Sequence, residues 1–253
     1  MSVKDKLGKR MKENYENCAK TFLSKKVPVA IRIDGKTFRT FTKGFDKPFD
    51  EILSNAMIKT MKYLCENVQG CIFGYQQSDE ITLILIDYKN LKTDAWFGYE
   101  VQKICSITAS MATIAFNKFF DQEYLDKLSE TGNCNLMHDL ARKKGAMFDA
   151  RCFNIPKEEV CNLIYWRQLD AIRNSIQMLA HTFFSHNELV GLNCASLRNK
   201  LLVEKNIDWD NFEIKWKHGV SCLKIDNTWQ IDYEMPMLKR DNRQYIDKLI
   251  FLE

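Results

Sequence analysis

The chain has 253 residues, of which 45% are hydrophobic and 28% are charged, as in globular proteins that bury a substantial core. No uninterrupted apolar run approaches the ~20 residues of a membrane-spanning helix, so we expect no membrane partner. The formal net charge of +4 permits a polyanionic partner but does not indicate one.

Cysteine usage predicts a reducing compartment. The nine cysteines are an odd number and the first residues lack the apolar core of a signal peptide, so we expect a cytoplasmic protein. No C-x-x-C pair occurs, and the spacing of His181 and His186 does not stack them on one helical face. A zinc site is therefore not expected.

Hydrophobic periodicity over the first 155 residues predicts alternating strands and helices. The expected elements are a charged helix over 2–23, a strand over 29–34, a helix from about 49 to 69, a hairpin within 71–86, a helix over 95–120 and a strand over 146–155. The stretch 121–144 is expected to be loop-like, with short helices as the alternative. The order strand, helix, strand, strand, helix, strand is the βαββαβ arrangement, also called ferredoxin-like. It predicts an α+β fold with a four-stranded antiparallel sheet, helices on one face and the other face open for function.

The pattern changes after Pro156. Helices are expected over 157–184 and 195–204, followed by short strand-like pieces between 208 and 233. In this last region, basic residues interleave with the aromatic residues Trp209, Phe212, Trp216 and Trp229. Such a pattern is typical of nucleic-acid binding by phosphate contact and base stacking, or of an amphipathic sheet with its aromatics inward. Both interpretations stay open.

Two predicted strands each bring an acidic residue to a turn. Asp34 ends the first strand, and Asp79 and Glu80 lie where the second strand of the hairpin begins. An unpaired buried carboxylate costs several kcal/mol, so acids beside such apolar strands need a reason. Solvated turns are one explanation. If both strands deliver Asp34 and Asp79 to one sheet edge, their oxygens form a site suited to magnesium.

A βαββαβ sheet with acids at these places is the polymerase-palm arrangement for phosphoryl transfer. Two magnesium ions can there activate the attacking oxygen and stabilise the leaving one. The turn Gly35-Lys36-Thr37-Phe38 offers backbone N–H groups to a triphosphate, because glycine permits close approach and Lys36 adds charge. Two unrelated turns remain the alternative from spacing alone.

Several collinear segments resemble the motifs of the tRNA-histidine guanylyltransferase superfamily. They are Ile31 to Phe38, Phe45 to Asp50, Gly74 to Glu80, Lys103 to Ser110, Phe148 to Arg151, Trp166 to Gln168 and Glu204 to Asn206. Members of this family resemble polymerase palms but extend nucleic acid in the 3′-to-5′ direction. The 5′ end of a tRNA is first activated with ATP or GTP, and the 3′-hydroxyl of an incoming nucleotide then attacks it.

The resemblance implies a role for each matching residue. Asp34, Asp79 and the carbonyl of Gly35 would hold two magnesium ions, and Glu80 matches an adjacent essential acid. Lys47 and Ser78 match residues of the activation step. The nucleotide-binding set would be Arg32, Gly35, Lys36, Thr37, Phe38, Arg39, Asp50 and Ser78.

Two departures from the family pattern bear on function. Arg39 stands where the family usually has histidine. The segment Ala171 to Gln177 replaces the H-I-N-x-L-Y-N motif of the guanylyltransferases that modify tRNA-histidine. The resemblance therefore points to the guanylyltransferase-like branch, whose members repair 5′-truncated tRNAs by templated addition.

The sequence thus predicts a palm-like catalytic domain over 1–155 and a tRNA-contacting C-terminal α/β extension over 156–253 that packs on it. The resemblance further implies a homotetramer. The alternatives are untemplated guanylate addition to tRNA-histidine, a palm-type nucleotidyl cyclase and a non-catalytic RNA-binding module. Exposed aromatics, which RNA-binding sheets need, are replaced here by Asp34 and Asp79. A cyclase would not need the chain beyond Pro156.

Overall fold

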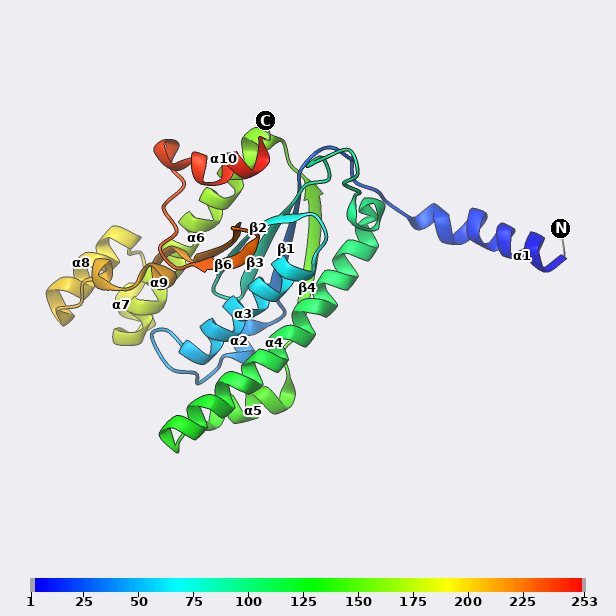
Figure 1. Ribbon diagram of the computed structural model, residues 1–253. Helices are drawn as coiled ribbons and strands as arrows, with labels where there is room; N and C mark the ends of the chain where they lie inside the picture. Colours follow the sequence, from blue (N-terminus) through cyan, green and yellow to red (C-terminus); the bar gives the residue numbers. More distant parts are fainter. Residues whose placement is uncertain (1–2, 252–253) are drawn as a thin grey trace.

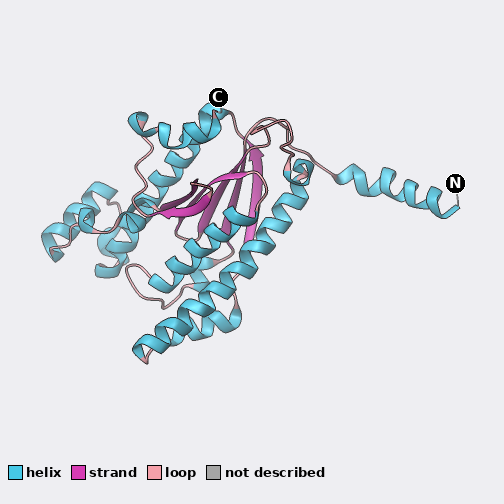
Figure 2. Ribbon diagram, viewed as in Figure 1, coloured by secondary structure: helices cyan, strands magenta, loops and turns pink. Residues whose placement is uncertain are grey.

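The computed structural model describes residues 3–251, which fold around a six-stranded antiparallel sheet with the strand order β4-β1-β3-β2-β5-β6 (Figures 1 and 2). The four strands expected from the sequence are confirmed. They are β1 (Val29–Gly35), β2 (Cys71–Gln77), β3 (Glu80–Leu85) and β4 (Phe148–Asn154).

The sheet has six strands instead of the expected four, because strand-like pieces predicted between 208 and 233 join it. β5 (Val220–Ile225) pairs with β2, and β6 (Thr228–Asp232) pairs with β5. β2 is almost wholly buried and would otherwise present a long unpaired edge, which folded proteins avoid. The C-terminal part of the chain therefore completes the sheet.

One face of the sheet carries the helices predicted for it. α3 (Glu51–Asn67) and α4 (Val101–Thr131) lie side by side on this face in Figure 1. Alternate strand residues such as Ile31, Ile33 and Leu83 point into the core between sheet and helices, because strand side chains alternate between faces. The prediction of both helices on one face is confirmed.

The opposite face is only partly open, which corrects the expectation of a free surface. α6 (Lys157–Phe183) and α10 (Gln244–Ile250) cover the apolar part of this face, where Ile164 and Ile250 pack against Phe73. The accessible part lies along β4, where the side chains of Asp149 and Arg151 are 57% and 49% exposed.

The stretch 121–144 is mostly helical, so the expectation of a loop is wrong and the alternative of short helices is met by α5. α4 continues to Thr131 because Tyr124 extends its buried side, and Gly132, in a left-handed conformation (φ 69°), ends it. α5 (Leu136–Lys144) then begins at Asn135, whose side chain accepts a hydrogen bond from the Met137 N–H. This cap satisfies a helix N–H that has no carbonyl partner.

The N-terminal helix is shorter than expected. α1 (Val3–Met11) continues as a π-helical turn (Lys12–Glu16) and a 3₁₀ turn (Asn17–Ala19), and Figure 1 shows α1 pointing away from the sheet. Residues 20–23 are not helical, since Phe22 forms a β-bridge with Glu100. The predicted start at Ser2 lies outside the described residues.

The remaining elements are short, apart from α8, which has 12 residues. They are α2 (Phe38–Phe41), α7 (His186–Leu189), α8 (Cys194–Lys205), α9 (Ile214–His218) and 3₁₀ turns at Trp96–Tyr99, Trp209–Asn211 and Arg240–Asn242. Of the strand-like pieces expected between 208 and 233, the first part instead forms a 3₁₀ turn and α9, and the part from Val220 is confirmed by β5 and β6. Within residues 3–251 no helix is both long and apolar enough to cross a membrane.

Candidate active site

The acids predicted from the sequence meet where the inner strands β1 and β3 reach one end of the sheet, which we call the acidic edge. Asp34 lies opposite Glu80 in the β1–β3 register, and the Gly35 N–H donates to the Asp79 carbonyl oxygen at 3.2 Å. Ser78, with φ 50°, makes the tight turn between β2 and β3 that turns Asp79 toward β1. Two segments far apart in sequence thus place Asp34, Gly35 and Asp79 together.

The charges at this edge are poorly compensated. Burial raises the pKa of Asp79, and the neighbouring charge of Asp34 raises it further. Burial also raises the pKa of Asp34, as does the charge of Asp149, while Arg151 and Arg32 act in the opposite direction. A bound cation would relieve this repulsion, so the donor set fits a hard divalent metal.

In the turn after Gly35, the polar side chains face solvent and the Phe38 side chain is buried. A side chain at Gly35 would overlap the ring of Phe38, so glycine is required there. Thr37 is left-handed (φ 54°), and Lys36, Thr37 and Arg39 are exposed. Phe38 is buried against Phe116 and Phe148, so only the backbone of this residue is available to a ligand.

Glu80 is bound in an ion pair. Its side chain is 8% exposed, and its Oε1 accepts a hydrogen bond from Arg167 Nε at 2.7 Å. Arg32 Nε lies 3.8 Å from the other oxygen, and Arg167 also donates to Asp170 at 2.7 Å. Burial raises the pKa of Glu80, and both arginines oppose that shift. Glu80 therefore ties α6 to the sheet.

No role was predicted from the sequence for Arg167. It lies in one of the matching segments, and the only signal for it was that a buried acid at Glu80 requires a cationic partner.

A cavity that is open to solvent lies beside the acidic edge. Asp50 and Ser78 both line it, together with Lys215 from α9. Ser78 also donates from its Oγ to Asp79 Oδ1 at 3.1 Å, so it links the cavity to the acids. Lys47 is exposed on the preceding loop and is not among the lining residues.

Aromatic rings and the C-terminal part of the chain form other walls of this cavity. Phe49 and Trp216 stack with ring centroids 4.9 Å apart. Ala171, Asn174 and Ser175 of α6 also line it, so the segment that departs from the guanylyltransferase motif faces the cavity.

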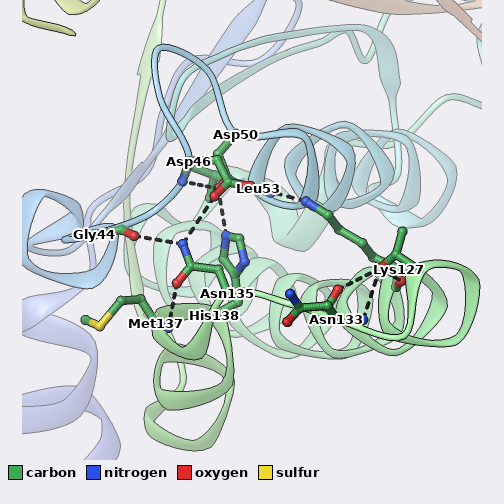
Figure 3. A network of polar contacts seen from close by, with 10 residues as sticks. Gly44, Asp46, Asp50, Leu53, Lys127, Asn133, Asn135, Met137 and His138 are labelled. Atoms are coloured by element: carbon green, nitrogen blue, oxygen red, sulfur yellow. Dashed lines mark hydrogen bonds and ion pairs between the residues drawn. The ribbon is translucent and has the colours of Figure 1, made fainter.

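Asp46, Asp50 and His138 form a second polar cluster (Figure 3). Within the described chain this is the one group of three or more acidic, histidine or cysteine side chains close enough to hold a metal. Lys127 Nζ already lies 3.2 Å from Asp46 Oδ2, and His138 Nε2 lies 2.6 Å from Asp50 Oδ2. Although burial acts in the opposite direction, the hydrogen bonds from Asn135 and Lys127 lower the pKa of Asp46. Lys127 thus neutralises Asp46 and His138 already bonds Asp50, so this cluster offers fewer free ligand atoms to a metal than Asp34 and Asp79 do.

Comparison with known proteins assigns the chain to a family. The model of the Thg1 family, described as tRNAHis guanylyltransferase, matches residues 8–156. An uncharacterized protein, R259, of Acanthamoeba polyphaga mimivirus is 32% identical over 215 residues, which cover 78% of this chain and 71% of that protein. A probable tRNA(His) guanylyltransferase of Dictyostelium discoideum is 25% identical over 80% of this chain and 77% of its own length.

Solved structures agree with this assignment. A bacterial tRNA(His) guanylyltransferase (Thg1)-like protein in complex with ATP is 39% identical, with a TM-score of 0.87 over 97% of this chain and 100% of that chain. A similar bacterial protein in complex with GTP is 35% identical, with a TM-score of 0.80 over 98% and 100% of the two chains. The matched residues 8–156 include the strands and the turn that carry the acids of the acidic edge. The chain therefore belongs to the tRNAHis guanylyltransferase family and is a nucleotidyltransferase.

Proposed function

We propose that this protein is a magnesium-dependent 3′–5′ nucleotidyltransferase that repairs the 5′ ends of tRNAs by templated addition. The observation that carries the proposal is the position of Ser78, which lines the cavity and donates a hydrogen bond to Asp79. A nucleotide in the cavity would thus lie next to a pair of metal-binding acids. The relatives solved with ATP and with GTP support a nucleotide as the occupant.

Asp34, Asp79 and the Gly35 carbonyl would hold the metal. Two magnesium ions at such a site stabilise the attacking and leaving oxygens of a phosphoryl transfer. The protein contributes position and charge. The exposed side chain of Lys36 and the backbone of the turn after Gly35 can bind phosphate oxygens.

Asp50 would contact the nucleotide, whereas Arg32 would act on the metal site. Asp50 is at the cavity, where its carboxylate can accept a hydrogen bond from the nucleotide. Arg32 is on the sheet face near Asp34 and lowers the pKa of that acid, so its positive charge acts on the metal site. The exposed Arg39 and Lys47 are available to phosphate groups.

The basic and aromatic side chains of the C-terminal region support tRNA binding by residues 156–253. Trp209 is only 7% exposed, so its ring packs inward and does not stack on bases. Arg198 and Lys217 lie over this ring, at 4.9 and 5.7 Å from its centroid. The Trp209 ring holds these two cations in place. Arg198 also pairs with the Asp210 carboxylate and Lys217 donates to the Asp210 carbonyl oxygen, so a phosphate would share them with Asp210.

We also propose the family's homotetramer. Leu7, Met11 and Tyr15 are 49%, 41% and 67% exposed along the N-terminal helical segment, which extends from the body (Figure 1). Burial of this apolar stripe between subunits would explain why it is exposed in one chain.

Templating can be tested with tRNAs that lack the first nucleotide and carry A, C, G or U opposite the gap. Because α6 lacks the H-I-N-x-L-Y-N motif, we expect selection by base pairing, with the complementary nucleotide added in every case. A mispaired nucleotide displaces the attacking hydroxyl, and a shift of about 1 Å can cost ~100-fold in rate. Addition of guanylate whatever the opposing base would instead support the runner-up, untemplated modification of tRNA-histidine.

The two chemical steps can be separated through Lys47 and Ser78. Their alanine variants are expected to fail on 5′-monophosphorylated tRNA and to keep most of their activity on 5′-triphosphorylated tRNA. The second substrate already carries a leaving group, so no activation is needed. Equal losses on the two substrates would show that these residues serve both steps. Lys43→Ala is the matched control, since Lys43 is an exposed lysine four residues before Lys47.

A further inference from the structure

His138 has no assigned role, yet it is bonded to a residue of the cavity. Its exposed fraction is 0%, and its Nε2 lies 2.6 Å from Asp50 Oδ2. The ring packs against Phe45 and Phe120, with centroids 4.4 and 6.1 Å away. Enclosure by aromatic rings strengthens a hydrogen bond to a carboxylate, because no water competes for it.

Asp50 joins three parts of the chain through its two oxygens. Oδ1 accepts from the Leu53 N–H at 2.9 Å and so caps α3. Oδ2 accepts from the Asp46 N–H at 3.0 Å and from His138. An ionised carboxylate has about four acceptor positions, so these three protein donors leave room for one ligand donor.

The loop over residues 44–50, which carries Lys47, is held from the side of α4 and α5. Asn135 Nδ2 donates to the Gly44 carbonyl oxygen at 2.9 Å and to Asp46 Oδ1 at 3.2 Å, and Lys127 Nζ donates to Asp46 Oδ2 at 3.2 Å. Figure 3 shows Lys127, Asn135 and His138 converging on the loop from these helices. At its other end the loop reaches the cavity through Asp50.

We propose that His138 is a positioning residue for the bound nucleotide. By donating to Asp50, it fixes that carboxylate and the 44–50 loop in the binding geometry before the ligand arrives, which lowers the ordering cost of binding. The inference rests on the proposed function only in taking the cavity as the nucleotide site. His138 Nδ1 has no hydrogen-bond partner in the described chain, so replacing the ring removes a single polar interaction.

The test compares variants that keep or remove the donor. His138→Leu keeps apolar bulk without a donor, whereas His138→Gln retains an N–H at about the reach of Nε2. His138→Asn carries the same amide but is too short to reach Asp50, and it replaces His138→Leu if that variant does not fold. The control Ala141→Gly changes a buried position on the same helix and weakens α5 without touching Asp50.

Binding of a non-hydrolysable ATP analogue with magnesium is measured by calorimetry on the full chain, without tRNA. We expect His138→Leu and His138→Asn to bind about 10- to 100-fold more weakly, as for loss of a hydrogen bond to a charged group. His138→Gln should stay within about fivefold of the unaltered protein, since it restores the donor. Ala141→Gly should bind normally despite a lower melting temperature.

Steady-state kinetics add a second readout. The KM for ATP on 5′-monophosphorylated tRNA should rise in His138→Leu, with kcat on 5′-triphosphorylated tRNA unchanged. Normal analogue binding by His138→Leu or His138→Asn would overturn the inference, as would equal losses in Ala141→Gly or His138→Gln. If the unaltered protein binds the analogue but adds nothing to tRNA, the proposed function fails and the binding data alone decide the role of His138.

Discussion

Replacement of Asp79 by asparagine is expected to lower nucleotide addition about a thousandfold and to leave the fold at least as stable as before. Loss of a metal ligand removes several kcal/mol of transition-state stabilisation, and each 1.36 kcal/mol is about tenfold in rate. Asp34→Asn should behave in the same way. Initial rates with 5′-triphosphorylated tRNA at saturating magnesium measure the effect.

The expected stability of the asparagine variants follows from the direction in which the pKa values of Asp34 and Asp79 are shifted. Burial raises the pKa of both acids, the charge of Asp149 raises that of Asp34 further, and the charge of Asp34 raises that of Asp79. Without metal the folded state therefore disfavours both charges. Such groups destabilise the fold as the pH rises through their folded-state pKa, and a neutral amide removes that cost. Thermal melting at neutral pH without magnesium should therefore give an equal or higher melting temperature.

The exposed acid Asp126 on α4 supplies a control, since Asp126→Asn should change neither rate nor melting temperature. Turnover near normal in Asp34→Asn or Asp79→Asn would remove these residues from the metal site.

Arg167→Met is expected to destabilise the protein by about 3–5 kcal/mol, because Glu80 would keep a buried charge without its main partner. The two side chains are 7% and 8% exposed, so water cannot replace the lost hydrogen bonds. Urea denaturation followed by circular dichroism measures the change. Restoring neutrality with the double variant Glu80→Gln, Arg167→Met should recover most of the loss, since no charge is then stranded.

The same variants decide how Glu80 acts. If this acid supports the site through Arg167, the double variant should fold well and keep more activity than Asp79→Asn. If Glu80 binds metal itself, the double variant should be as inactive as Asp79→Asn. A single Arg167→Met variant of normal stability would show that Arg32, 3.8 Å away, is sufficient to compensate Glu80.

The palm strands were predictable because their patterns are local. Alternating apolar residues in β1 and the acids beside Gly35 and Ser78 identify both the strands and the edge at which Asp34 and Asp79 meet. α5 was expected only as a short helix within a loop-like stretch, because Leu136 and Leu140 stay exposed and do not form its buried face. Its helix depends on the Asn135 cap and on packing against α4.

The supporting contacts were not predictable in the same way. Nothing in the sequence near Asp50 indicates that His138 would be its donor, or that β5 would pair with β2. Such pairs depend on how distant segments pack, and a single sequence does not encode them in local periodicity.

The pairing of Phe73 with Leu223 has a consequence for how the chain folds. Central strand β2 acquires its second neighbour only after almost the whole polypeptide has left the ribosome. Loop closure over such a distance is entropically costly, so completion of the sheet should be a slow, late step. A fragment that ends at residue 155 would expose the apolar edge of β2, and we expect it to aggregate through that edge.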